Sequence, residues 1–247
     1  MEPEPEPEPA ADVPVGAAGA AGAAALTLTL AYGDDRASLR AFREVQDRVH
    51  CPFARRARMW GSPDPQADVS LEGYALACAE SLSEFARVMC SASGRDCEDP
   101  ESPDGYVLRI AGDQYGHSLA AFADAVRVVL SALSSVDPSG RRAMEEPGAR
   151  DSTKSWRFSF GSCGMFVSTF APCYPPTSSR YQFGVSDDSC FVVFQPDIIF
   201  DEKQIHGGTN IRATFARKGQ PYEVDNNREW PHQRCCYRDN IHRRTHE

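Results

Sequence analysis

The stretch that decides the fold is 190–194, which reads CFVVF and predicts an apolar strand that ends at Pro196. Two strands precede it in the chain. Residues 156–160 (WRFSF) alternate strictly between apolar and polar, as a half-buried strand does, and 165–170 continue in the same character. A further short strand is expected at 106–110. The second half of the chain is therefore dominated by strands.

Three helices are expected before most of these strands. Apolar residues at helical spacing predict the first up to about Val49, with Asp34 or Asp35 as its cap. The second begins at Ser70 and the third runs over about 117–136, while a last short helix is expected at 210–218. Helices first and strands later favour an α+β fold, a single domain whose antiparallel or mixed sheet is packed by helices.

Charge is spread unevenly along the 247 residues. The formal net charge is −9, of which −5 lies in residues 1–12, and this leaves −4 for the remaining chain. We expect 1–25 to be a disordered acidic tail rich in Pro, Ala and Gly, 26–240 to be the folded domain, and 241–247 to be a basic C-terminal tail. Acidity of this kind argues against a general nucleic-acid binder.

The N-terminal sequence and the cysteines bear on the compartment. The acidic start lacks the positive charge of a signal peptide, and 15–30 is too weakly apolar for a membrane span, so a cytoplasmic protein with reduced thiols is expected. The nine cysteines are an odd number without a C-x-x-C pair. Cys78, Cys90 and Cys190 are predicted to be small core residues.

Three stretches carry residues suited to chemistry. Residues 50–54 (HCPFA) offer an imidazole that can ligate a metal or haem iron, although His50 can equally favour a helix end. The Pro-rich loop 171–184 holds Arg180, which suits either a ligand carboxylate or a structural ion pair. Gln195 can hydrogen-bond a ligand or cap the edge of a strand.

The order of these pieces resembles the YqcI/YcgG family. The matching pieces are 51–54 (CPFA) after a helix, 117–119 (HSL) opening the long helix, 156–160, the loop ending in 178–181 (SSRY), and 194–201 (FQPDIIFD); Ile211-Arg212, Pro221-Tyr222, Trp230 and Asp239-Asn240 follow in family order. Members studied so far are haem-dependent N-oxygenases of arginine-like amino acids, which implies b-type haem as cofactor and O2 as co-substrate.

The resemblance also implies roles for particular residues. The iron would be ligated by one histidine, ranked in the order His50, His117, His206. The residues expected to bind the cofactor or the substrate carboxylate are Arg180, Ser179, Tyr181 and Phe53. The residues expected to orient the cationic nitrogen of the substrate are Gln195 and Asp197.

The resemblance also implies partners, and two other functions remain as alternatives. A small amino-acid substrate and an electron donor are expected, with no nucleic acid or membrane partner, and a homodimer is left open. One alternative is a non-enzymatic binding module that uses the acidic tail and the Arg-rich C-terminal arm. Another is a thiol-redox protein that uses Cys51 or the pair 235–236 (CC).

Overall fold

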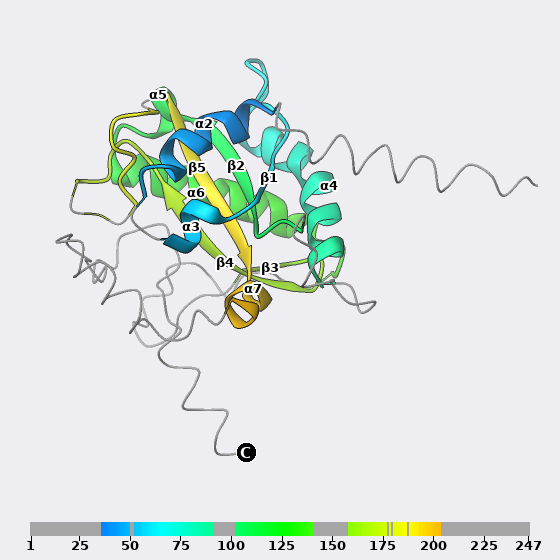
Figure 1. Ribbon diagram of the computed structural model, residues 1–247. Helices are drawn as coiled ribbons and strands as arrows, with labels where there is room; N and C mark the ends of the chain where they lie inside the picture. Colours follow the sequence, from blue (N-terminus) through cyan, green and yellow to red (C-terminus); the bar gives the residue numbers. More distant parts are fainter. Residues whose placement is uncertain are drawn as a thin grey trace, which may run out of the picture. The chain divides into compact units, whose positions relative to one another are not determined.

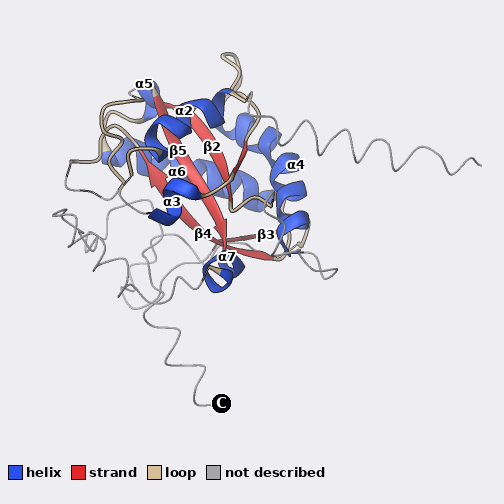
Figure 2. Cartoon of the chain, in the orientation of Figure 1, coloured by secondary structure: helices blue, strands red, loops and turns tan. Residues whose placement is uncertain are grey.

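Five strands form one mixed sheet at the centre of the fold (Figure 1). In sheet order they are β1 (Met59–Gly61), β2 (Gly105–Ala111), β5 (Ser189–Pro196), β4 (Cys163–Phe170) and β3 (Phe158–Phe160). Strands β1 and β2 are parallel, and every other neighbouring pair is antiparallel. Helices cover both faces, so the α+β class expected from the sequence is confirmed, with a mixed sheet (Figure 2).

The computed structural model describes residues 36–49, 52–90, 102–140, 158–176, 178, 180–186 and 188–203. All of them belong to one compact unit, Asp34–Glu247, whereas the unit Met1–Gly33 lies outside the described residues. The expected tails and the expected helix at 210–218 also lie outside them. None of the helices in the described ranges is long and apolar enough to cross a membrane.

The position of β5 at the centre of the sheet explains why its sequence does not alternate between apolar and polar residues. It pairs with β2 on one side and β4 on the other, and six of its first seven residues are buried. Helices lie against both faces at this point, so side chains pointing either way must be apolar. Phe191 and Val193 point to one face, and Phe194 points to the other, where it contacts Tyr106 at 6.2 Å between ring centroids.

One face of the sheet is covered by the two long helices, α4 (Leu71–Cys90) and α6 (Leu119–Ser135). Phe85 of α4 packs on Tyr106 of β2 at 5.8 Å between ring centroids. The hydroxyl of Ser118 caps α6 by accepting from the amide of Ala121 at 3.2 Å. Both long helices were expected from their apolar spacing, and the structure confirms them.

The opposite face carries α2 (Ala37–Gln46), α3 (Pro52–Arg56) and α7 (Asp197–Glu202). Phe42 of α2 meets Phe170 and Phe191 edge-on, with ring centroids 5.5 and 5.2 Å apart. The helix also approaches β1 closely, because a Cβ added to Gly61 would lie 2.7 Å from Cγ of Leu39. Only glycine fits at that position without a shift of the neighbouring side chain.

Several boundaries differ from those expected. Helix α2 begins after Arg36 and has no side-chain cap, so the predicted cap at Asp34 or Asp35 is wrong. Strand β5 runs on through Pro196, which pairs with Met165, instead of ending before it. The elements β1, α3, the short α5 (Gly112–Tyr115) and α7 were not predicted, because three to six residues are too few to show a period.

The cysteines depart from the expectation of reduced thiols. Cys90, the last residue of α4, is exposed and forms a disulfide with Cys163 at the start of β4, with a Cα–Cα distance of 5.7 Å. The prediction that Cys90 is a core thiol is therefore wrong. The prediction holds for Cys78 and Cys190, which are free and fully buried.

The disulfide should contribute strongly to stability, because it joins residues 73 apart in sequence. Closing a loop of that length in the unfolded chain corresponds to about 4 kcal/mol. Cys90→Ala should therefore lower the free energy of unfolding in urea by about that amount. Dithiothreitol should lower it similarly in the unsubstituted protein and change little in the variant.

Cys173→Ala removes a free thiol and serves as the matched control, which should keep the full response to dithiothreitol. Equal unfolding curves for the unsubstituted protein with and without the reductant would contradict the stabilising role of the disulfide.

Candidate functional site

Most of the described residues expected to bind or react lie on the sheet face that carries α2. An apolar group here is called the α2-face cluster. Its buried members are Phe42, Val45, Val49, Val107, Phe170, Phe191 and Val193, and the half-buried members are Ala41, Ala54, Met59, Phe183 and Val185. Because the buried members are already packed, a ligand can contact only the half-buried rim of this cluster.

Arg180 lies over the edge of this cluster. Its guanidinium carbon is 5.4 Å from the ring centroid of Phe170, a distance at which the cation is attracted to the ring face. Its Nε is buried and has no hydrogen-bond partner in the described part of the chain. No described carboxylate pairs with it, so the structural ion pair considered from the sequence does not occur among these residues. The side chain keeps donor capacity for an anion.

The loop that carries Arg180 is held by its neighbours. Phe183 has a φ of 60°, an uncommon conformation for a bulky residue, and Gly184 follows with 67°. The ring of Phe183 packs on the α2-face cluster and lies 5.3 Å from that of Tyr181, and this burial offsets the backbone strain. Tyr181 is thereby fixed next to Arg180.

Gln182 is a residue of this loop that sequence reasoning missed. It is almost fully buried and donates from Nε2 to the carbonyl of Ser189 at 3.0 Å. Its Oε1 is buried without a partner among the described residues. Nothing in the sequence distinguishes it from the other polar residues of the loop.

Gln195 and Asp197 lie at the other end of the same face. Cγ of Gln195 lies next to Gly105, and no described residue hydrogen-bonds its amide. Oδ2 of Asp197 lies over Gly164, where an added Cβ would come within 2.8 Å of it. Asp197 also begins α7, where a carboxylate is favoured by the helix dipole.

The two sets of polar groups are separated along β5. Phe170 under Arg180 pairs with Phe191, four residues before Gln195. Four strand residues span roughly 13 Å. The face therefore presents a cation at one end, an amide and a carboxylate at the other, and apolar side chains between them.

Of the three candidate histidines, the structure describes His117 alone. His117 is exposed and lies just before Ser118, the cap of α6, a helix that covers the opposite face of the sheet. His50 and His206 lie outside the described residues, as does Ser179, and the side chain of Phe53 is not described. Among the described residues there is no group of three or more His, Cys, Asp or Glu able to hold a metal ion.

Free thiols in the described ranges are poorly suited to redox chemistry. Burial raises the pKa of Cys78 to about 11, and burial also raises the pKa values of Cys173 and Cys190 above the ordinary range. Such thiols stay protonated at neutral pH, and the thiolate is the reactive form. Cys51 and residues 235–236 lie outside the described residues.

Comparisons of the chain with models of protein families, with curated proteins and with solved structures give no match. The resemblance to the YqcI/YcgG family therefore rests on the residues and their order in the chain.

The buried thiol and phenols on the α4 side predict a loss of stability at alkaline pH. Burial raises the pKa of Cys78 to about 11 and raises the pKa values of Tyr74 and Tyr106. The unfolded chain then releases these protons first, so stability is complete below about pH 8.5 and falls as pH rises. For Cys78 the loss between pH 9 and 11 should reach about 2 to 3 kcal/mol.

Urea unfolding at pH 8.5 and at pH 10.5 measures this loss. Cys78→Ala should show a smaller decrease between the two values, because one titrating group is removed, while Ser83→Ala on the same helix removes no titrating group and serves as the control. An equal decrease in the unsubstituted protein and in Cys78→Ala would contradict the assignment to Cys78.

Proposed function

We propose that the protein is a haem-dependent oxygenase of the YqcI/YcgG type, which hydroxylates a nitrogen of an arginine-like amino acid. O2 is the co-substrate, and a separate donor supplies electrons. The observation that carries the proposal is the convergence on one sheet face of α3, the Arg180 loop and the end of β5. These segments are far apart in sequence, and each contains a residue quoted for the resemblance.

The described residues meet two of the needs of a haem site. A porphyrin requires apolar contact, which the half-buried rim of the α2-face cluster offers, and its propionates require a cation. The buried, unpartnered Nε of Arg180 fits the second need. Met59 of the rim lies next to Gly105 and so toward the Gln195 end of the face, and Phe183 lies next to Tyr181.

The third need is an axial ligand, for which His50 is the proposed residue. Val49 precedes it in the chain and is a buried member of the α2-face cluster, and Ala54 four residues later packs on the same cluster. His206 is the second choice. His117 does not fit, because it is exposed and begins the helix of the opposite face.

The proposed roles follow the positions of the side chains. Haem iron, when bound, supplies the activation of O2. Arg180 binds a propionate or the substrate carboxylate, with Tyr181 packed next to it. At the other end, the amide of Gln195 and the carboxylate of Asp197 accept hydrogen bonds from the cationic nitrogen of the substrate and orient it. The apolar rim keeps water away from that nitrogen.

Absorption spectroscopy of protein produced with haem supplementation tests this function. The full chain should show a Soret band with about one haem per chain. His50→Ala should lose or shift that band, because the axial ligand is removed. His117→Ala is the matched control and should keep the spectrum unchanged.

A full chain that remains colourless after haem supplementation would contradict the proposal, and would favour a binding module without a cofactor. A band lost in His117→Ala and kept in His50→Ala would contradict the proposed site.

A further inference from the structure

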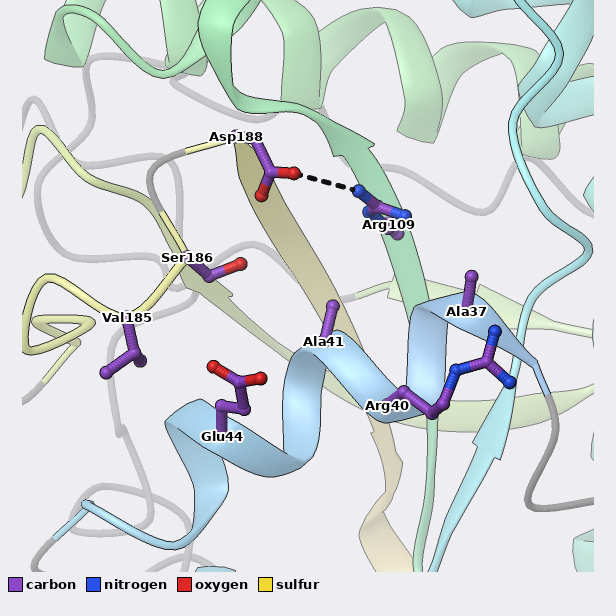
Figure 3. Close-up of a pocket in the computed structure, with 8 residues that line it drawn as sticks. All are labelled: Ala37, Arg40, Ala41, Glu44, Arg109, Val185, Ser186 and Asp188. Carbon is purple, nitrogen blue, oxygen red and sulfur yellow. Dashed lines mark hydrogen bonds and ion pairs between the residues drawn. The ribbon is translucent and has the colours of Figure 1, made fainter.

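A cavity of about 440 Å³ lies along α2 and is not lined by Gln195 or Asp197 (Figure 3). Its walls come from α2, from β2 and from the segment before β5. Two basic residues, Arg40 and Arg109, and two acidic residues, Glu44 and Asp188, line it. The charges therefore balance within one hollow.

Arg109 is the fixed cation of this cavity. It interrupts the otherwise apolar strand β2, and that interruption is the sequence signal that could have identified it. Its Nε donates to the hydroxyl of Ser189 at 2.8 Å, and Nη2 lies 3.5 Å from the carboxylate of Asp188. Three-quarters of the side chain is buried, so the guanidinium is oriented before any ligand arrives.

Glu44 supplies a negative charge that no described residue neutralises. Its carboxylate forms no hydrogen bond or ion pair with any residue that the structure describes, and in Figure 3 it points toward the segment carrying Ser186. The hydroxyl of Ser186 is likewise without a partner among the described residues, although the residue is buried. Between Glu44 and Arg109 lies Ala41, whereas Val185 lines the cavity on the side of Glu44 away from Arg109 (Figure 3).

We propose that this cavity binds a small zwitterion, an amine and a carboxylate joined by a short carbon chain. The ammonium pairs with Glu44, the carboxylate pairs with Arg109, and the carbon chain lies against Ala41. A simple anion would meet the carboxylates of Glu44 and Asp188, and a simple cation would meet the guanidinium groups. Only a ligand that carries both charges can place each of them next to a group of opposite charge.

The cavity shares Ala41 and Val185 with the rim of the α2-face cluster, but the groups proposed to orient the substrate nitrogen do not line it. Gln195 and Asp197 do not line the cavity, and Arg109 lies four residues along β2 from Gly105, the residue next to Gln195. The proposal does not depend on haem, so its test is independent of the test of the proposed oxygenase activity.

Isothermal titration calorimetry of the full chain tests the proposal with glycine, 4-aminobutanoate and 6-aminohexanoate as probes. 1-Butylamine and butanoate carry one charge each and serve as ligand controls. At least one zwitterion should bind, and about tenfold or more tightly than either control, because each charged hydrogen bond contributes to the affinity.

Glu44→Gln keeps the size of the side chain and removes its charge at an exposed position, so the variant should fold. It should weaken binding of the preferred zwitterion about tenfold. Glu80→Gln, at an exposed position on α4 away from the cavity, should bind as the unsubstituted protein does.

Three results would overturn the proposal: no heat of binding with any of the three zwitterions, equal affinity for 1-butylamine or butanoate, or unchanged affinity in Glu44→Gln. Circular dichroism of the variant confirms that a loss of binding is not a loss of folding.

Discussion

The packing of Phe42 against Phe170 and Phe191 is the contact on which one half of the fold depends. The three rings belong to α2, β4 and β5, and the two edge-on pairs join segments that are about 130 and 150 residues apart in the chain. Each such pair contributes about 0.5 to 1.5 kcal/mol beyond the burial of apolar area. Through Phe42, α2 covers a sheet face that would otherwise expose Phe170, Phe191 and Val193 to water.

Other features follow once α2 is docked. Gln46 at its end donates from Nε2 to the carbonyls of Ala54 and Ala57, both at 2.7 Å, and so fixes the segment that carries α3. Phe183 and Val185 pack on the same cluster and hold the loop that carries Arg180. One side of α2, from Ala37 to Glu44, forms a wall of the charged cavity. The candidate oxygenase site and the cavity thus share one structural origin, while their polar groups remain separate.

The sequence predicted the features that repeat over many residues. The apolar spacing of α4 and α6 and the uninterrupted run of β5 identify these elements, because burial of one helix face or of both strand faces leaves a long pattern. It did not predict β1 or α7, which are too short for a pattern. The pairing of Cys90 with Cys163 depends on a contact between α4 and β4 that spacing along the chain does not reveal.

The residues of the candidate site also divide into those that the sequence predicted and those that it did not. Arg180 and Gln195 were singled out from the residue types of a loop and a strand end, and the structure brings both to one face. His117 was ranked with them because it opens a long helix, yet the sequence does not say which face that helix covers. Arg109 and Glu44 were overlooked because a cation in an apolar strand and an acid on a helix surface gain meaning only when the fold sets them around one cavity.

The proposed function requires that haem bind on the sheet face covered by α2. Paramagnetic line broadening in the protein loaded with ferric haem, compared with a diamagnetic zinc porphyrin, measures proximity to the metal directly. The side-chain N–H signals of Arg180 and Gln195 should broaden, and the ring signals of His117 should stay sharp. Broadening of His117 with sharp signals for Arg180 and Gln195 would contradict the account.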